Sequence, residues 1–92
     1  MRILYLGDIH GNFALIGQYI KLYGIKDAHI IQVGDFGVGF ATVEKERRML
    51  DPLNQTLIKN NVIVWAIRGN HDFKPHFDND PFGFSNIHLV KD

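Results

Sequence analysis

The sequence contains no cysteine, which excludes disulfide cross-links and thiolate chemistry and leaves no argument for secretion. It also lacks an excess of charge, because ten Lys and Arg residues balance ten Asp and Glu residues. No global field would therefore attract nucleic acid or an anionic membrane. No apolar run is long enough for a signal peptide or a membrane span. The compartment that we expect is the cytoplasm.

The length and composition are those of one ordinary folded domain. The 92 residues suffice for a single hydrophobic core. Hydrophobic residues make up 46% of the chain and charged residues 22%, which is typical of a globular protein and unlike a disordered one. We therefore treat residues 1–92 as one domain.

Three apolar runs share one arrangement, since each is followed by glycine and then by Asp or Asn. They are residues 3–6 before Gly7-Asp8-Ile9-His10-Gly11, residues 30–33 before Gly34-Asp35, and residues 62–68 before Gly69-Asn70-His71-Asp72. If the runs are parallel neighbours in one sheet, their carboxyl ends meet at the edge where open α/β sheets bind ligands. The side chains expected to converge there are Asp8, His10, Asp35, Asn70, His71 and Asp72.

The first third of the chain has the pattern of a strand, a helix and a second strand. Residues 2–7 are apolar on both faces, as in a parallel strand that is covered on each side. A helical stripe follows, with Asn12 as the expected N-cap and Gly24 as the C-terminal cap. Residues 28–33 then complete a βαβ unit.

A second helix is expected in the middle of the chain. Thr42 is a suitable N-cap for a helix over residues 43–60. Proline inside a helix removes a hydrogen bond and clashes with the preceding turn. Asp51-Pro52 therefore predicts either a kink or a new helix that begins with Asp51 as its cap.

The last third of the chain supplies two more strands. Residues 62–68 form the most apolar segment, which we expect at the centre of the sheet. Residues 73–85 carry two prolines and four phenylalanines, and we expect a loop that packs its aromatic rings onto the fold. Residues 86–91 alternate as in a short final strand. Together these elements predict an α/β fold with a parallel sheet and flanking helices.

The polar residues at the strand ends suit a transition metal. Asp8 and His10 are two positions apart, so in an extended backbone their side chains point the same way. Asp35 adds a second carboxylate and Asn70 a neutral oxygen. Such a mixed oxygen and nitrogen set suits manganese, iron, zinc, cobalt or nickel better than calcium. The simpler alternative is that each Asp or Asn only caps the helix that follows it.

The three motifs Asp-x-His, Gly-Asp and Gly-Asn-His-Asp, in this order on strand ends, resemble those of the calcineurin-like metallophosphoesterase family. The resemblance implies half of that family's α/β sandwich and a site for two divalent ions. Carried over by position, Asp8 and His10 bind one ion, Asp35 bridges both, and Asn70 binds the second.

The resemblance also implies a catalytic role for the end of the third motif. His71 corresponds to the acid that protonates the leaving oxygen or steadies the phosphate. Asp72 completes the motif and is placed with His71 among the catalytic residues, where it is expected to orient the histidine.

The sequence departs from the family pattern in two respects. Val38 and Gly39 stand where the protein phosphatase branch has Asp and Arg, which argues against a dedicated phosphoprotein phosphatase. The family also completes its metal site with histidines from a second half that this sequence does not contain. Either the sequence is a fragment, or the ligands come from His76, His88, a second copy of the chain or another chain. The simpler interpretation of His76 and His88 is an ordinary loop residue and an ordinary strand residue. The sheet face that meets the second half is expected to be exposed and apolar, which predicts a dimer or higher oligomer.

The reaction implied by the resemblance is hydrolysis of a phosphomonoester or phosphodiester by a metal-activated water. The alternative is a non-catalytic remnant of the fold that serves as a metal-binding or protein-interaction module. The missing histidines favour this alternative, whereas the complete Gly-Asn-His-Asp motif favours catalysis. A nuclease of the same family is a third reading, which the neutral charge does not favour.

Overall fold

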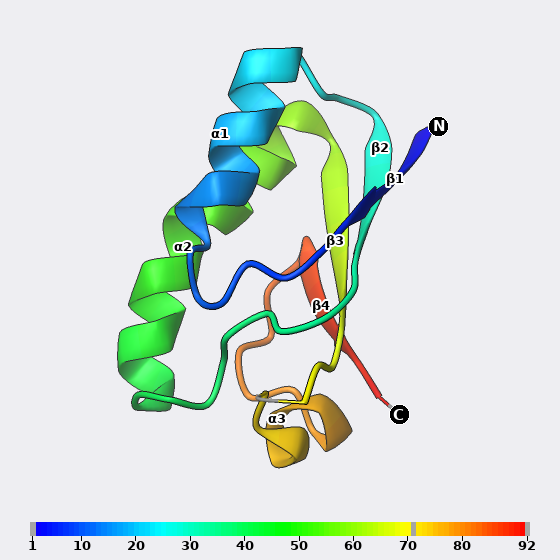
Figure 1. The fold of residues 1–92 in the computed structure, drawn as a ribbon. Helices are drawn as coiled ribbons and strands as arrows, with labels where there is room; N and C mark the ends of the chain where they lie inside the picture. Colours follow the sequence, from blue (N-terminus) through cyan, green and yellow to red (C-terminus); the bar gives the residue numbers. More distant parts are fainter. Residues whose placement is uncertain (1, 71, 92) are drawn as a thin grey trace.

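The computed structural model describes residues 2–70 and 72–91, and its centre is a four-stranded parallel sheet (Figure 1). The strands lie in the order in which they occur in the chain: β1 (Arg2–Leu6), β2 (Ala28–Gln32), β3 (Val62–Ile67) and β4 (Ile87–Val90). The α/β fold predicted from the sequence is therefore confirmed, as is the interior position of β3. In the register, Leu6 pairs with Gln32 and Gln32 with Ala66, so β1, β2 and β3 end close to one another.

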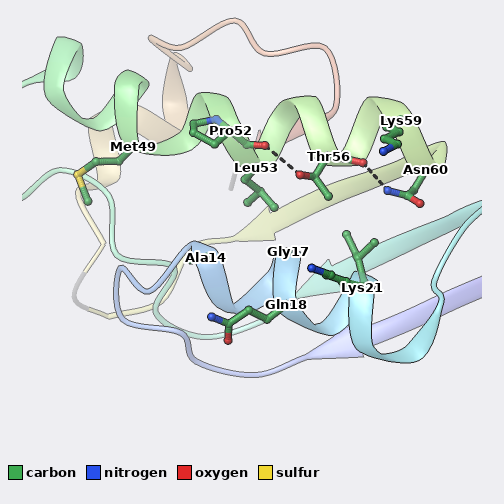
Figure 2. A pocket seen from close by; sticks show the side chains of 11 residues that line it. Ala14, Gly17, Gln18, Lys21, Met49, Pro52, Leu53, Thr56, Lys59 and Asn60 are labelled. Carbon is green, nitrogen blue, oxygen red and sulfur yellow. Dashed lines mark hydrogen bonds between the residues drawn. The ribbon is translucent and has the colours of Figure 1, made fainter.

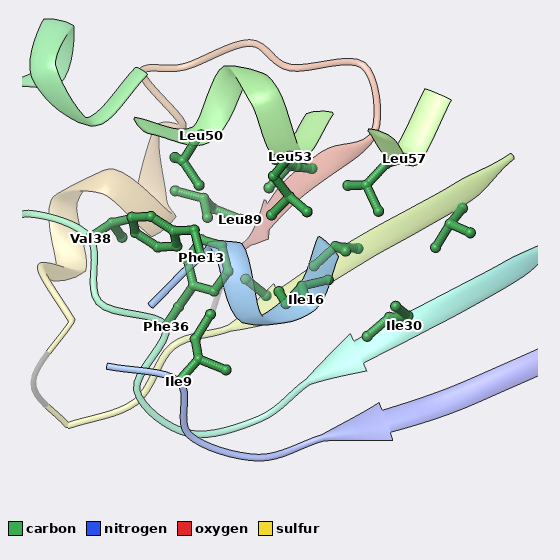
Figure 3. Packing of buried hydrophobic residues seen from close by; sticks show 14 of the residues in the cluster. Ile9, Phe13, Ile16, Ile30, Phe36, Val38, Leu50, Leu53, Leu57 and Leu89 are labelled. Carbon is green, nitrogen blue, oxygen red and sulfur yellow. The ribbon is translucent and has the colours of Figure 1, made fainter. Parts of the chain in front are cut away.

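The helices α1 (Ala14–Tyr23) and α2 (Val43–Asn60) both cover the same face of the sheet (Figure 1). Alternate strand residues point toward them and are buried, and the helices contribute their own buried stripes (Figure 3). The other face of the sheet has no helix in the part of the chain that the structure describes. The expectation that both faces of β1 are covered is thus wrong, since Ile3 is 60% and Tyr5 is 76% exposed.

The start of α1 differs from the prediction. The helix begins after Phe13, not Asn12, and no side chain caps it. Phe13 is buried against Phe36, with ring centroids 5.0 Å apart, so packing of an aromatic ring fixes this helix end in place of a cap. The predicted C-terminal cap is confirmed, because Gly24 has a left-handed backbone and its N–H donates to the Ile20 carbonyl.

Helix α2 runs without interruption past Pro52. Thr42 caps it as predicted, since its Oγ1 accepts a hydrogen bond from the Lys45 N–H at 3.2 Å. The alternative of a second helix that starts at Asp51 is wrong. Leu50 and Leu57, on either side of the proline, are both fully buried. Burial of this continuous stripe offsets the loss of the helical hydrogen bond that Pro52 cannot make.

The segment after β3 contains a short helix that the sequence did not predict, α3 (Lys74–Asp78). Pro75 lies in its first turn, where the missing N–H has no intrahelical partner to lose. The salt bridge from Lys74 Nζ to Asp78 Oδ2, at 2.7 Å, lowers the pKa of Asp78. Phe77 and Phe82 are buried, whereas Phe73 is 48% exposed, so the expectation that this segment packs its aromatic rings onto the fold is confirmed only in part.

The open face of the sheet, opposite the helices, is apolar. Trp65 of β3 lies on this face. Its indole N–H donates to His29 Nδ1 at 3.0 Å, and its ring stacks on His88. The edge strands expose Tyr5 and Val90 on the same face. No helix in the described part of the chain is long and apolar enough to cross a membrane.

Candidate metal centre

The turns after β1 and β2 bring two carboxylates together. Gly34 has φ +88°, which a residue with a side chain rarely adopts, and its backbone lies directly on Asp8. A Cβ added at Gly34 would lie only 1.5 Å from Asp8 Oδ1. The same oxygen accepts the Asp35 N–H at 3.0 Å. The glycine after β2 therefore allows Asp8 and Asp35 to become neighbours.

Backbone hydrogen bonds place His10 beside these carboxylates. The Asp35 carbonyl accepts the N–H groups of both Ile9 and His10 at 3.0 Å, and the Phe36 carbonyl accepts that of Gly11 at 2.9 Å. His10 itself has a left-handed backbone, with φ 48°. The Asp-x-His turn is thus attached to the loop that begins at Asp35.

The imidazole of His10 lies between the two carboxylates. Its Nε2 is 3.5 Å from Asp8 Oδ2, and its Nδ1 is 3.7 Å from Asp35 Oδ2. One ligand atom from each residue lies within 4.8 Å of the other two. Around an ion with bonds of about 2.1 Å, neighbouring ligand atoms lie roughly 3.0–4.2 Å apart. The three side chains therefore fit one small divalent ion after minor adjustment.

The turn after β3 lies against the same centre. A Cβ added at Gly69 would be 2.2 Å from Asp35 Oδ1, so this position requires glycine for close approach. Asn70 follows immediately and is exposed. Its role as a ligand stays a prediction. His71, the predicted acid, lies outside the described residues.

Asp72 is buried behind the centre and contacts backbone amides. It is only 6% exposed, although it carries a carboxylate. The N–H groups that donate to its two oxygens, at 2.6–3.3 Å, belong to Phe36, Gly37, Val38 and Gly69. Asp72 thereby joins the loop after β2 to the turn after β3. The sequence indicated an acidic residue here but not these partners.

Gln32 is a further residue of the centre that the sequence analysis missed. It is fully buried at the end of β2, and its Nε2 donates to the carbonyls of Gly7, Val33 and Gly34 at 3.2–3.3 Å. The glutamine thus connects the two turns that carry Asp8 and Asp35. The available signal was a polar residue, Gln32, within the apolar run of residues 30–33.

Comparison with known proteins identifies the family. A family model described as calcineurin-like phosphoesterase matches residues 1–91. The chain belongs to this family. No curated protein and no solved structure matched it. The assignment confirms the resemblance carried by the three motifs, and the structure places the first two of them at one candidate metal site.

Two histidines considered as replacement ligands lie elsewhere in this calcineurin-like chain. His88 stacks on Trp65, with ring centroids 4.8 Å apart. His76 makes edge contacts with the rings of Phe73 and Phe82. Neither belongs to the cluster of Asp8, His10 and Asp35. Their aromatic contacts explain both side chains without a metal.

A cavity of about 400 Å³ opens beside the candidate centre and is lined by His10, Asp35, Gly37 and Phe40. A larger groove, of about 700 Å³, lies between α1 and α2 (Figure 2). Ala14 and Gly17 leave space on α1, and Lys21 and Lys59 lie along the groove. None of the residues that line this groove belongs to the predicted site. We therefore place the chemistry at the smaller cavity.

Proposed function

We propose that this chain binds a divalent cation at Asp8, His10 and Asp35 and hydrolyses phosphomonoesters or phosphodiesters. The observation that carries the proposal is the convergence of these three side chains, from the turns after β1 and β2, within 4.8 Å. The family assignment supports it, because the match covers residues 1–91 and so includes all three motifs.

The residues divide the work by their chemistry. A bound divalent ion would acidify a water and offset the charge of the phosphate. Asp8 and Asp35 supply negative charge to hold the cation, and His10 offers a neutral nitrogen, which favours manganese, iron, zinc, nickel or cobalt. Gln32 and the Gly34 turn keep the two carboxylates adjacent.

The third motif extends the proposal to two ions and a proton donor. Asp35 would help to hold both ions, and Asn70 would help to hold the second. His71 would protonate the leaving oxygen. Asp72 supports this turn from behind, because its carboxylate accepts the Gly69 N–H at 3.0 Å. The resemblance implies that further histidine ligands complete the site, so metal binding is measured before turnover.

Calorimetric titration of manganese into metal-free protein tests the metal site. We expect binding by the wild type. The affinity of Asp35→Asn should be lower by about 100-fold or more, because the amide lacks the charge that holds the ion. Asp51→Asn is the matched control, since it removes the same charge from an exposed position on α2. Equal affinities for the two variants would contradict the proposed site.

Hydrolysis of a generic phosphodiester with added manganese tests the reaction. We expect activity from the wild type and a loss of about 10²- to 10⁴-fold in His71→Ala, as for removal of a general acid. Metal binding without any hydrolysis would support the alternative of a non-catalytic, metal-binding module.

We also propose that the chain works in the cytoplasm and that a second copy covers the open sheet face. The absence of cysteine supports the compartment. The apolar side chains on this face, including Ile3 and Tyr5, support the partner, because such a surface gains from leaving water. Two copies of an apolar face also meet without repulsion between like charges.

Light scattering at micromolar concentration measures this association. We expect about twice the mass of one chain for the wild type, and the mass of one chain for Tyr5→Lys, which places a charge on the face. Leu22→Lys, at an exposed position on α1, should leave the mass unchanged. A monomeric wild type would contradict the proposed partner.

A further inference from the structure

The loop from Phe36 to Ala41 has an uncommon hydrogen-bonding pattern beyond its contact with Asp72. Its second half is bound by Glu46, a residue of α2 that lies outside the three motifs. The Gly39 N–H donates to both carboxylate oxygens at 2.9 and 3.0 Å, and those of Phe40 and Ala41 donate to Oε2 at 3.2 and 3.3 Å. Glu46 is only 2% exposed.

Two buried carboxylates thus divide six successive backbone amides between them. Asp72 accepts the N–H groups of residues 36–38, and Glu46 accepts those of residues 39–41. We call Asp72 and Glu46 the carboxylate bracket. Because its amides are already occupied, the loop is not free to bind a phosphate through its backbone, despite its glycines.

The opposite side of the loop is attached to the metal-binding turn. The carbonyls of Asp35 and Phe36 accept N–H groups from residues 9–11. The loop therefore lies between the carboxylate bracket and the Asp-x-His turn. A shift of its backbone would move Asp35 directly and His10 through these hydrogen bonds.

Glu46 is well placed to fix the loop, because its own backbone is fixed. It lies in the first turns of α2, whose start is capped by Thr42. Farther along the helix, Leu50, Leu53 and Leu57 are buried in the core. The side chain thus transmits the position of a packed helix to a loop that has no regular secondary structure of its own.

We propose that Glu46 is a positioning residue of the metal centre, which acts through the loop of residues 36–41 on Asp35 and His10. The inference rests on the proposed function, in that the centre must bind a cation. It assigns to α2 a part in building the site, although α2 supplies none of the predicted metal ligands.

The first test compares the manganese affinities of Glu46→Gln and Glu44→Gln. Both variants remove one charge from the start of α2, but Glu44 is exposed. In Glu46→Gln, one acceptor oxygen is replaced by an NH₂ group that faces the amides of the loop. We expect the manganese affinity of Glu46→Gln to fall about 10-fold, as it does when a residue that supports a metal ligand is replaced. The manganese affinity of Glu44→Gln should stay unchanged. Circular dichroism verifies that both variants are folded under the conditions of titration.

The second test measures amide hydrogen exchange by NMR in the metal-free proteins. If Glu46 positions the whole loop, Glu46→Gln should accelerate exchange at residues 36–38, which Asp72 binds, as well as at 39–41. Two results together would overturn the proposal and leave Glu46 a merely stabilising role. They are faster exchange at residues 39–41 alone, and a manganese affinity of Glu46→Gln equal to that of Glu44→Gln. If the wild type binds no manganese, the proposed function fails, and exchange at residues 36–38 still decides whether Glu46 positions the loop.

Discussion

Asp72→Ala should lower the free energy of unfolding by about 3–5 kcal/mol, because it leaves four backbone N–H groups without their acceptor. Each buried donor without a partner costs about 1–3 kcal/mol, and water that enters the space of the lost carboxylate offsets part of the sum. A domain of this size has a total stability of about 5–15 kcal/mol, so the variant should lose a large fraction of it. Urea denaturation measures the difference.

Two further variants make this measurement specific. Asp72→Asn retains one acceptor oxygen and should lose less stability than Asp72→Ala. Asp78→Ala removes a carboxylate whose side chain contacts Lys74 on the surface of α3, and little change is expected. If Asp72→Ala were as stable as Asp78→Ala, water would satisfy the four amides and the Asp72 carboxylate would not contribute to stability.

Gly34→Ala should weaken manganese binding by about 10- to 100-fold while the chain remains folded. The added Cβ would meet the Asp8 carboxylate, which can rotate away only by leaving its place beside Asp35. The left-handed backbone at residue 34 adds a strain of about 1–3 kcal/mol to the folded state. Calorimetric titration and thermal denaturation measure the two effects separately.

Gly83→Ala is the matched control for this variant. Gly83 also has a positive φ, of +66°, but its added Cβ would meet nothing within 4 Å. The control should therefore lose stability through backbone strain and keep the metal affinity of the wild type. A similar loss of affinity in both variants would mean that strain alone disturbs the site, and that contact with Asp8 is not the cause.

The strands and the convergence of three polar side chains at their ends could be predicted because each depends on a local pattern. An apolar run followed by Gly-Asp indicates both a strand and the residue that leaves its end, and the parallel register then brings the ends together. Asp8, His10 and Asp35 meet for this reason. Thr42 and Gly24 were recognised as caps because capping depends on adjacent backbone.

What the sequence did not reveal depends on contacts between distant residues. Glu46 lies in a run of charged residues, with Lys45 before it and Arg47 after it, and only the folded loop shows that its carboxylate is buried. Phe13 replaces Asn12 at the start of α1 because Phe36 packs on its ring. The burial of β1 was overestimated because apolar residues on both faces do not show whether anything covers the second face.

The sequential order of the strands also determines how the sheet can be assembled. Each strand pairs with the one that precedes it in the chain, so β1 and β2 can associate without β3. The residues Asp8, His10 and Asp35 all precede α2 in the chain. The cation site can therefore begin to form before the rest of this chain has left the ribosome. The carboxylate bracket closes behind the site once Glu46 and Asp72 emerge.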